Sequence, residues 1–137
     1  MNIAVTTILA SLLATVFLVL SLRVIRLRRE HKVALGDGGN EQLGRAIRGH
    51  ANWAEYAPIG ILLVLIAELQ SVNVIVLAVL AAAFALGRAF HAYAFGFTSG
   101  SMFLRVRGMQ LTFFTILILA VLNIAMLLYG WIGVGGS

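Results

Sequence analysis

Four polar residues of this sequence are spaced so that they lie on one face of a helix. They follow the pattern i, i+3, i+7, i+10, which at about 100° per residue confines them to a stripe roughly 80° wide, and they are Arg45, Arg48, Asn52 and Glu55. Guanidinium, carboxamide and carboxylate groups are strong hydrogen-bonding groups. Gathered on one face, they favour a binding site for a polar, anionic ligand.

A second group of residues with helical spacing follows later in the chain. Arg88, His91 and Phe95 have the spacing i, i+3, i+7, so they also share one helix face. The sequence contains no cysteine, which excludes disulfides, zinc–thiolate sites and a protein thiol nucleophile. Any sulfur chemistry must therefore use the thiol of a substrate. His50 has no companion at metal-ligand spacing, so no metal site is expected.

The elements that carry these residues must lie in a membrane. Of the 137 residues, 61% are hydrophobic and 11% are charged, and the net charge is +5. This composition excludes a soluble globular domain and a disordered tail. The apolar runs are continuous rather than alternating, which disfavours a β-barrel. The basic residues flank those runs without forming a platform with aromatic residues, so nucleic acid is not an expected partner.

Four apolar stretches predict four membrane-crossing helices, because about 20 residues cross a bilayer. The helices are expected at residues 3–22, 42–69, 74–95 and 104–129. A basic string from Arg23 to Lys32 ends the first stretch, which we interpret as a retained anchor rather than a cleaved signal peptide. The glycine-rich residues 130–137 are expected to fray. The chain is therefore predicted to be a single all-α domain, residues 1–137, folded as an integral membrane four-helix bundle.

The basic residues also predict the orientation of the bundle. All ten Lys and Arg residues lie in the segments 23–48 and 88–107. By the positive-inside rule, the connection between the first two helices and that between the last two then face the cytoplasm. An even number of crossings places both termini outside.

Counting along the helices places the polar groups at one depth. Depth is counted from the turn at Gln70, which we take as the outer surface of the membrane, and each helical residue adds about 1.5 Å. Glu55 then lies about 22 Å in, Arg88 about 26 Å and His91 about 30 Å, close to the inner boundary of a hydrocarbon core about 30 Å thick. Because an ionised side chain in hydrocarbon needs a partner, we expect Glu55 to pair with Arg88.

Such a pair alone would only hold two helices together, and this purely structural interpretation stays open for Glu55 and Arg88. The polar groups around the pair exceed what that role needs, and the excess favours an anionic ligand. These further groups are Arg48, Asn52, His91 and one of Arg105 and Arg107.

Several other polar residues have structural interpretations. Pro58 lies inside the second helix and predicts a bend there. The segment 36–39 lacks the residues of a phosphate loop and is expected to form a turn, in which Asp37 hydrogen-bonds locally. Glu68 is expected to be solvated at the outer end, and His50 is assigned a structural role. Ordinary interhelical hydrogen bonds are expected of Thr112, Thr115 and Asn123.

Four motifs resemble those of one family. The residues from Arg45 to Pro58, RAIRGHANWAEYAP, resemble the second-helix motif of the MAPEG family, the membrane-associated proteins in eicosanoid and glutathione metabolism. Three further motifs are similar to those of its small bacterial inner-membrane branch: VALGDGG at residues 33–39, GRAFH at 87–91 and RVRGM at 105–109. The resemblance covers nearly the whole chain, and the motifs occur in order.

The resemblance implies a homotrimer in the inner membrane. In that membrane, the outer side that the basic residues predict for both termini is the periplasm. It implies glutathione as cosubstrate, bound between neighbouring subunits near the cytoplasmic side. Carried over by position, the binding residues are Arg26, Arg48, Asn52, Glu55, Tyr56, Arg88 and His91. The arginine that stabilises the thiolate in transferase members starts the fourth helix, so Arg107 is the first candidate for this catalytic role and Arg105 is the second.

The implied activity is that of a glutathione-dependent transferase or peroxidase acting on lipophilic electrophiles in the bilayer. A low-dielectric pocket with several arginines and one glutamate suits glutathione, which carries two carboxylates, an ammonium and a thiol. The sequence departs from the family at Phe95, where several animal members have Tyr, so a hydroxyl near the thiol is missing. Two alternatives stay open: a non-catalytic lipid- or glutathione-binding scaffold of the same fold, and a small multidrug-type exporter, which the Arg-rich layer disfavours.

Overall fold

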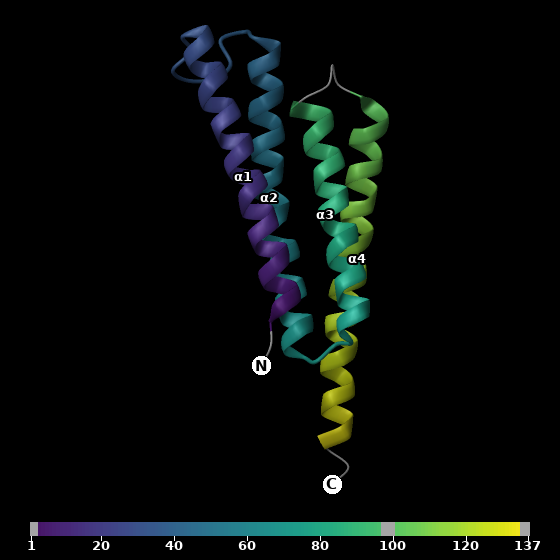
Figure 1. The fold of residues 1–137 in the computed structure, drawn as a ribbon. Coiled ribbons are helices and arrows are strands. Elements are labelled where there is room, and N and C mark those ends of the chain that lie inside the picture. Colours follow the sequence, from purple (N-terminus) through teal and green to yellow (C-terminus); the bar gives the residue numbers. More distant parts are fainter. Residues whose placement is uncertain (1–2, 97–100, 135–137) are drawn as a thin grey trace.

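The computed structural model of this chain describes residues 3–96 and 101–134, which form four α-helices and contain no strand. The helices are α1 (Ala4–His31), α2 (Glu41–Leu69), α3 (Val74–Gly96) and α4 (Met102–Val134). Each is long and apolar enough to cross a membrane. They alternate in direction, so the start of α1 and the end of α4 lie at the same end of the bundle (Figure 1). This confirms the predicted all-α architecture with four membrane-spanning helices.

α1 is longer than its apolar run and continues through the basic string to His31. Arginine favours helix, and the basic side chains in the last turn, Arg28, Arg29 and His31, lie at the negative end of the helix dipole. Lys32 then adopts the left-handed conformation, with a φ of 55°, and ends the helix. The basic string therefore extends α1 instead of ending it.

The α1–α2 connection contains the predicted glycine turn. Its three glycines have φ between 59° and 76°, a region that favours glycine. Asp37 accepts a hydrogen bond from the Gly39 N–H at 3.0 Å, which confirms its predicted local role. Asn40 then caps α2, because its side chain accepts a hydrogen bond from the Leu43 N–H at 2.9 Å.

An apolar core contains side chains from all four helices. Leu13 of α1, Trp53 of α2, Phe84 of α3 and Leu119 of α4 are almost completely buried in it. The indole N–H of Trp53 donates to the Leu13 carbonyl at 3.1 Å, which satisfies the one polar group of this side chain. The hydrogen bond holds the Trp53 side chain of α2 against α1, next to the polar residue Asn52.

Two glycines let α3 and α4 pack closely along their backbones. A Cβ at Gly87 would lie 3.0 Å from the Gly108 carbonyl oxygen, and a Cβ at Gly108 would lie 2.7 Å from the His91 backbone nitrogen. Small residues allow such close approach between membrane helices. The contact places the polar residues of α3 directly against the first turns of α4.

Glu68 is half-buried at the end of α2 and has specific partners there, which the sequence did not suggest. Its two carboxylate oxygens accept hydrogen bonds from the backbone N–H groups of Val5 and Thr6, at 2.9 and 2.8 Å. Those N–H groups belong to the first turn of α1 and have no partner within the helix. Glu68 therefore caps α1 and ties its start to the end of α2.

Other polar side chains match their predicted roles in part. His50 Nε2 lies 2.9 Å from the Ser21 hydroxyl oxygen, which gives it the structural role expected of it. Asn123 joins helices as predicted, because it donates to the Leu63 carbonyl and accepts from Gln70. Two hydroxyls of α4 bond carbonyls of their own helix instead. The predicted interhelical bonds are therefore wrong for Thr112 and Thr115.

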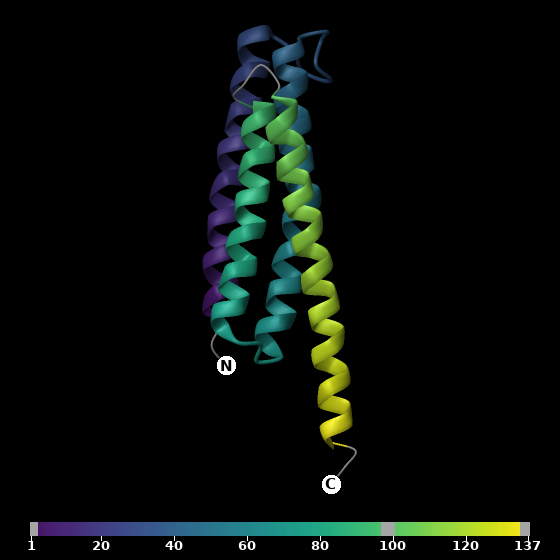
Figure 2. The same ribbon diagram turned by 90° about the vertical axis from the view of Figure 1, so that its right-hand side faces the viewer.

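α4 continues beyond the level at which the other helices end (Figure 2). It includes Gly130 and reaches Val134, whereas the sequence predicted a frayed tail from residue 130 onward. Residues 135–137 of that tail lie outside the described residues, as do residues 97–100 between α3 and α4.

Candidate functional site

Arg88 is the centre of the polar layer. It lies on α3, and its side chain has an exposed fraction of 0%. One terminal nitrogen, Nη2, donates to the side-chain and backbone oxygens of Asn52 on α2, at 2.6 and 3.2 Å. The other terminal nitrogen, Nη1, lies 3.6 Å from the sulfur of Met109 on α4. One guanidinium group thus contacts two neighbouring helices inside the bundle.

Two aromatic rings of α2 flank the Arg88 guanidinium. Its central carbon lies 5.1 Å from the centre of the Tyr56 ring and 5.8 Å from that of the Trp53 ring. Ring faces attract a cation at such distances, and more strongly where water is excluded. The rings therefore help to hold a charge that hydrocarbon alone would not accept. The remaining donor, Nε, has no hydrogen-bond partner among the described residues.

The ion pair predicted between Glu55 and Arg88 is wrong. Glu55 is exposed, and the ion pairs within the described part of the chain do not include it. Asn52, nearly one turn earlier on the same face of α2, occupies the position at the guanidinium instead. Because a carboxamide is neutral, α2 satisfies Arg88 without burying a second charge.

A second cluster lies nearly one turn further along α3. His91 is buried, and its Nδ1–H donates to the backbone carbonyl of Arg105 on α4 at 3.1 Å. The Phe95 ring packs against the His91 ring, with 5.0 Å between their centres. The guanidinium carbon of Arg105 lies 4.0 Å from the centre of the Phe95 ring. The cluster therefore holds an arginine at the start of α4 by a ring contact.

The other candidate residues do not join these clusters within one chain. Arg48 and Glu55 lie exposed on α2, although they share its polar stripe. Arg107 is exposed, and its hydrogen bond goes to a side chain of its own helix. Arg26 lies on α1, where its Nε donates to Glu30 at 2.8 Å. In the described segments no group of three or more His, Asp or Glu residues could hold a metal ion.

Comparison with known proteins settles the relationship that the motifs suggested. A sequence model of the MAPEG family matches residues 6–125. The chain belongs to the MAPEG family. It is 34% identical over 120 residues to the inner membrane protein YecN of Escherichia coli K12, an alignment that covers 88% of this chain and 90% of that protein. YecN of Escherichia coli O6:H1 strain CFT073 has the same 34% identity and the same coverage.

This MAPEG chain brings part of the predicted site together. Asn52, Tyr56 and Arg88 meet directly. His91 lies nearly one turn along α3, with Arg105 against it. The remaining charged candidates lie on surfaces that a single chain leaves open: Arg26, Arg48, Glu55 and Arg107.

Two residues that contact Arg88 were missed by the sequence reasoning, Trp53 and Met109. Nothing in the sequence separates them from ordinary core residues, because aromatic and methionine side chains at helical spacing commonly fill apolar space. Their one signal is position, since each stands in a MAPEG motif that also carries polar residues. Phe95 was noted for sharing a helix face with Arg88 and His91 and for its missing hydroxyl, whereas the structure shows that its ring also contacts Arg105.

Proposed function

We propose that this chain is a glutathione-dependent transferase or peroxidase of the inner membrane that acts on lipophilic electrophiles. The observation that carries the proposal is the Arg88 cluster, in which a fully buried guanidinium is held by Asn52 at 2.6 Å between membrane-spanning helices. Ionisable side chains at such depth mark functional sites by default. Membership of the MAPEG family supports glutathione as the ligand, and YecN, an inner membrane protein, supports the location.

The chemistry of the arginines suits glutathione. Guanidinium groups bind carboxylates by charge-assisted, often bidentate hydrogen bonds, and glutathione carries two carboxylates. A nearby positive charge lowers the pKa of a thiol from about 8.5, so the reactive thiolate forms near neutral pH. The thiolate sulfur then forms a bond to the electrophilic carbon, and the leaving group departs with its electron pair. The arginine acts only through its charge and takes up no proton.

The proposed site lies between neighbouring copies of the chain. Arg48 and Glu55 are exposed on the polar stripe of α2, and an ionised side chain facing hydrocarbon costs about 2.5–3.5 kcal/mol on insertion scales. A second copy together with the ligand would cover both. We propose a homotrimer, as family resemblance implies, and native mass spectrometry in mild detergent should give the mass of three chains. A monomer that binds glutathione at full affinity would contradict a shared site.

Arg105 and Arg107 are the two candidates for the thiolate-stabilising charge. Arg105 is half-buried and held by the Phe95 ring beside His91. Arg107 is exposed and would act only in a site completed by another copy. The structure of one chain therefore favours Arg105, while the position at the start of α4 fits both.

An apolar groove between α1 and α2 suits the lipophilic second substrate. Its volume is about 320 Å³, and its lining includes Phe17, Trp53 and Pro58. Trp53 lines this groove and also contacts Arg88, so an apolar molecule in the groove lies near the polar layer. Burial of apolar surface supplies the affinity for such a molecule.

A non-catalytic binding scaffold is the second candidate function. The observation that favours it is Phe95, whose ring provides no hydroxyl to the thiol and instead contacts Arg105. Such a protein would bind glutathione or lipid in the same layer without turnover.

One experiment separates the two functions. Purified protein in detergent is titrated with glutathione near neutral pH, and thiolate formation is followed by ultraviolet absorbance. Turnover is measured with an aryl halide and with an organic hydroperoxide. Thiolate formation with turnover supports the enzyme, and thiolate formation without turnover leaves the scaffold. Absence of binding at millimolar glutathione would contradict both functions.

Matched variants identify the arginine. Arg105→Gln and Arg107→Gln remove the same charge two positions apart, and Arg29→Gln controls for the general loss of positive charge. We expect one of the first two variants to lose the thiolate absorbance while keeping its oligomeric mass. If neither loses it, the start of α4 does not stabilise the thiolate.

A further inference from the structure

Arg105 is held at both its backbone and its guanidinium by side chains of α3. Its backbone carbonyl accepts a hydrogen bond from His91 Nδ1–H at 3.1 Å, and its guanidinium carbon lies 4.0 Å from the centre of the Phe95 ring. The two rings of α3 also pack against each other, with 5.0 Å between their centres. Two residues about one turn apart on α3 therefore fix one residue at the start of α4.

The two helices are themselves in close contact at this level. A Cβ at Gly108, less than one turn after Arg105, would lie 2.7 Å from the His91 backbone nitrogen. Such a backbone contact leaves α4 little freedom to shift against α3. The Phe95 ring and the Arg105 guanidinium are therefore carried by a closely packed pair of helices.

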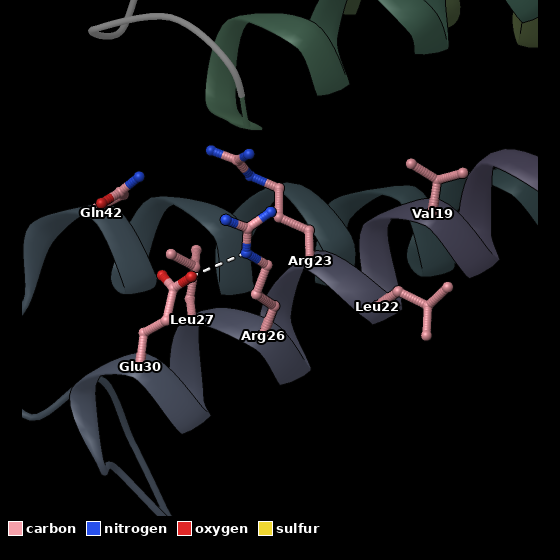
Figure 3. Close-up of a pocket in the computed structure, with 7 residues that line it drawn as sticks. All are labelled: Val19, Leu22, Arg23, Arg26, Leu27, Glu30 and Gln42. Atoms are coloured by element: carbon pink, nitrogen blue, oxygen red, sulfur yellow. Dashed lines mark hydrogen bonds and ion pairs between the residues drawn. The ribbon is translucent and has the colours of Figure 1, made fainter.

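An aromatic ring holds a guanidinium without neutralising its charge. Arg26 has the other common arrangement, because its Nε donates to the Glu30 carboxylate at 2.8 Å and a negative charge lies beside the positive one (Figure 3). The ion pairs of the described residues do not include Arg105. A ring face attracts a cation through its quadrupole and has no net charge. Arg105 therefore keeps its full positive charge for an anion.

The ring contact also leaves the donor groups of Arg105 available. A guanidinium carries five N–H donors, and a ring face is a much weaker acceptor for them than an oxygen atom. Within residues 3–96 and 101–134, no hydrogen bond of the structure uses these N–H groups. Arg105 is thus held in place and still able to bind an anion.

Arg107 is held less closely, although it also lies near a ring. Its guanidinium carbon is 5.4 Å from the centre of the Phe103 ring, and both side chains are exposed. The Arg105 and Phe95 side chains are both half-buried. A cation is attracted more strongly to a ring where less water surrounds the contact. The Arg107–Phe103 contact is therefore a natural control for the Arg105–Phe95 contact.

We propose that Phe95 is a positioning residue whose ring holds the Arg105 guanidinium in place beside the glutathione thiolate. The inference rests on the proposed function and deepens it. Where several animal members of the family have a hydroxyl, this chain has a ring that holds the stabilising charge. A free arginine side chain samples many rotamers, and a charge that moves away from a thiol lowers its pKa less. Phe95 acts only through Arg105.

The first measurement needs no ligand. In the full chain in micelles, NMR detects the arginine Nε–H groups, and Arg105→Gln identifies the signal of Arg105. The ring current of Phe95 shifts this signal, so Phe95→Leu should move it towards the position of an exposed arginine. Phe103→Leu is the matched control and should move only the Arg107 signal. An Arg105 signal that Phe95→Leu leaves unchanged would overturn the proposal.

The second measurement is the pH profile of thiolate absorbance at saturating glutathione. Phe95→Leu should raise the apparent pKa of the bound thiol by about 1, which is about a tenfold loss of thiolate at low pH. Phe103→Leu should leave the pKa unchanged, and Phe95→Tyr, which keeps the ring, should preserve it. In the Arg105→Gln background, Phe95→Leu should add no further shift. Equal shifts with and without Arg105 would mean a general packing effect and would overturn the proposal.

The outcomes separate this inference from the proposed function. A thiolate that forms with a pKa independent of Phe95 overturns only the role of Phe95. Absence of a thiolate in the unchanged chain overturns the proposed function and, with it, the role of the contact in catalysis. His91 titrates in the same pH range, so its ring signals are followed in parallel by NMR.

A second change at position 95 covers the case in which Phe95→Leu does not fold. Pentafluorophenylalanine in place of Phe95 keeps the shape of the ring but removes the negative character of its face. We expect it to raise the pKa of the bound thiol as Phe95→Leu does. An unchanged pKa with this side chain would show that the ring does not act through its attraction for the cation, and would overturn the proposal.

Discussion

The guanidinium of Arg88 lies where water does not reach it, surrounded by Asn52, Tyr56 and Met109. A hydrogen bond to a charged group contributes about 1.5–3 kcal/mol. Removing the partner of a buried charge costs more than the bond alone, because the charge stays behind without solvation. The stability of this layer should therefore depend on Asn52 and not on the exposed Glu55.

Asn52→Leu removes the Oδ1 acceptor and leaves Arg88 with the backbone oxygen of residue 52. We expect the free energy of unfolding to fall by about 2–3 kcal/mol, measured by denaturant titration of the purified protein in micelles. Glu55→Leu is the matched control and should cause no such loss. The assignment of Asn52 as the partner fails if the control destabilises the protein more.

Combining Asn52→Leu with Arg88→Met removes the charge together with its partner. The loss should then be smaller than the sum of the two single losses by about 1 kcal/mol or more, because the two residues are coupled. Additive losses would mean that the two side chains stabilise the bundle independently.

Depth and helix face were enough to place Asn52, Glu55 and Arg88 in one layer, but not to pair them. Asn52 and Glu55 lie on the same stripe of α2, and the formal charges favoured Glu55. The partner depends on how far α2 is rotated about its axis against α3, which is set by packing across the whole bundle. Trp53 is part of that packing, and periodicity alone does not reveal it.

At the scale of the helices, α3 and α4 form the closest pair, because glycines replace side chains at their contact. Gly108 lies with its Cα against the backbone of His91 and Gly87. Backbone atoms cannot swing aside as a flexible side chain can, so the space for a methyl group has to come from separating the helices. That separation would also move His91 away from the Arg105 carbonyl.

Gly108→Ala should therefore destabilise the protein by about 1–3 kcal/mol. Gly130→Ala on the same helix is the control, since its Cβ would meet nothing within 4 Å, and alanine favours helix by about 1 kcal/mol. The stabilities of the two variants are compared by thermal unfolding, which is monitored by circular dichroism. Equal stability of the two variants would mean that α3 and α4 lie further apart than described.

Glu68 makes the opposite end of the bundle dependent on a single carboxylate. Glu68→Ala leaves the Val5 and Thr6 N–H groups without acceptors and should cost about 1–2 kcal/mol. Hydrogen exchange of the first turn of α1 should become faster, which is the direct measurement. Glu41→Ala, at an exposed pair within α2, serves as control and should leave that exchange unchanged.

Helix ends show where sequence patterns succeed. The bounds of α2 and α3 agree closely with the prediction, because Asn40 caps one helix and a short turn at residues 70–73 separates the two. The end of α1 was misplaced, since the end of an apolar run marks the membrane boundary and not the last helical residue. The role of Glu68 depends on α1 and α2 lying side by side, which no local pattern contains.

At the scale of the whole molecule, the basic residues and the folded topology agree. The helix ends that carry most of the basic residues, which are the end of α1, the start of α2, the end of α3 and the start of α4, lie at one end of the bundle, opposite the start of α1 (Figure 1). The side of the membrane on which this end lies follows from the positive-inside rule and remains a prediction. The natural absence of cysteine makes it simple to test.

Single cysteines report the sidedness. Ser71→Cys, at the α2–α3 turn, should react with a membrane-impermeant maleimide in intact cells, whereas Leu35→Cys, in the α1–α2 connection, should react only after permeabilisation. Both positions are exposed, with Leu35 at 90%. The reverse labelling pattern would place the basic end outside and would refute the predicted orientation.

The bond between Asn52 and Arg88 also bears on how the chain enters the bilayer. α2 is the least hydrophobic of the four spans, and α3 carries a charge, Arg88, near its C-terminal end. Neither helix meets its polar partner until both have emerged from the translocation channel. Joined by a short turn, they are best released into lipid together as a hairpin. A substitution at Asn52 or Arg88 is therefore expected to lower the efficiency of membrane insertion first, before it affects folding of the bundle or ligand binding.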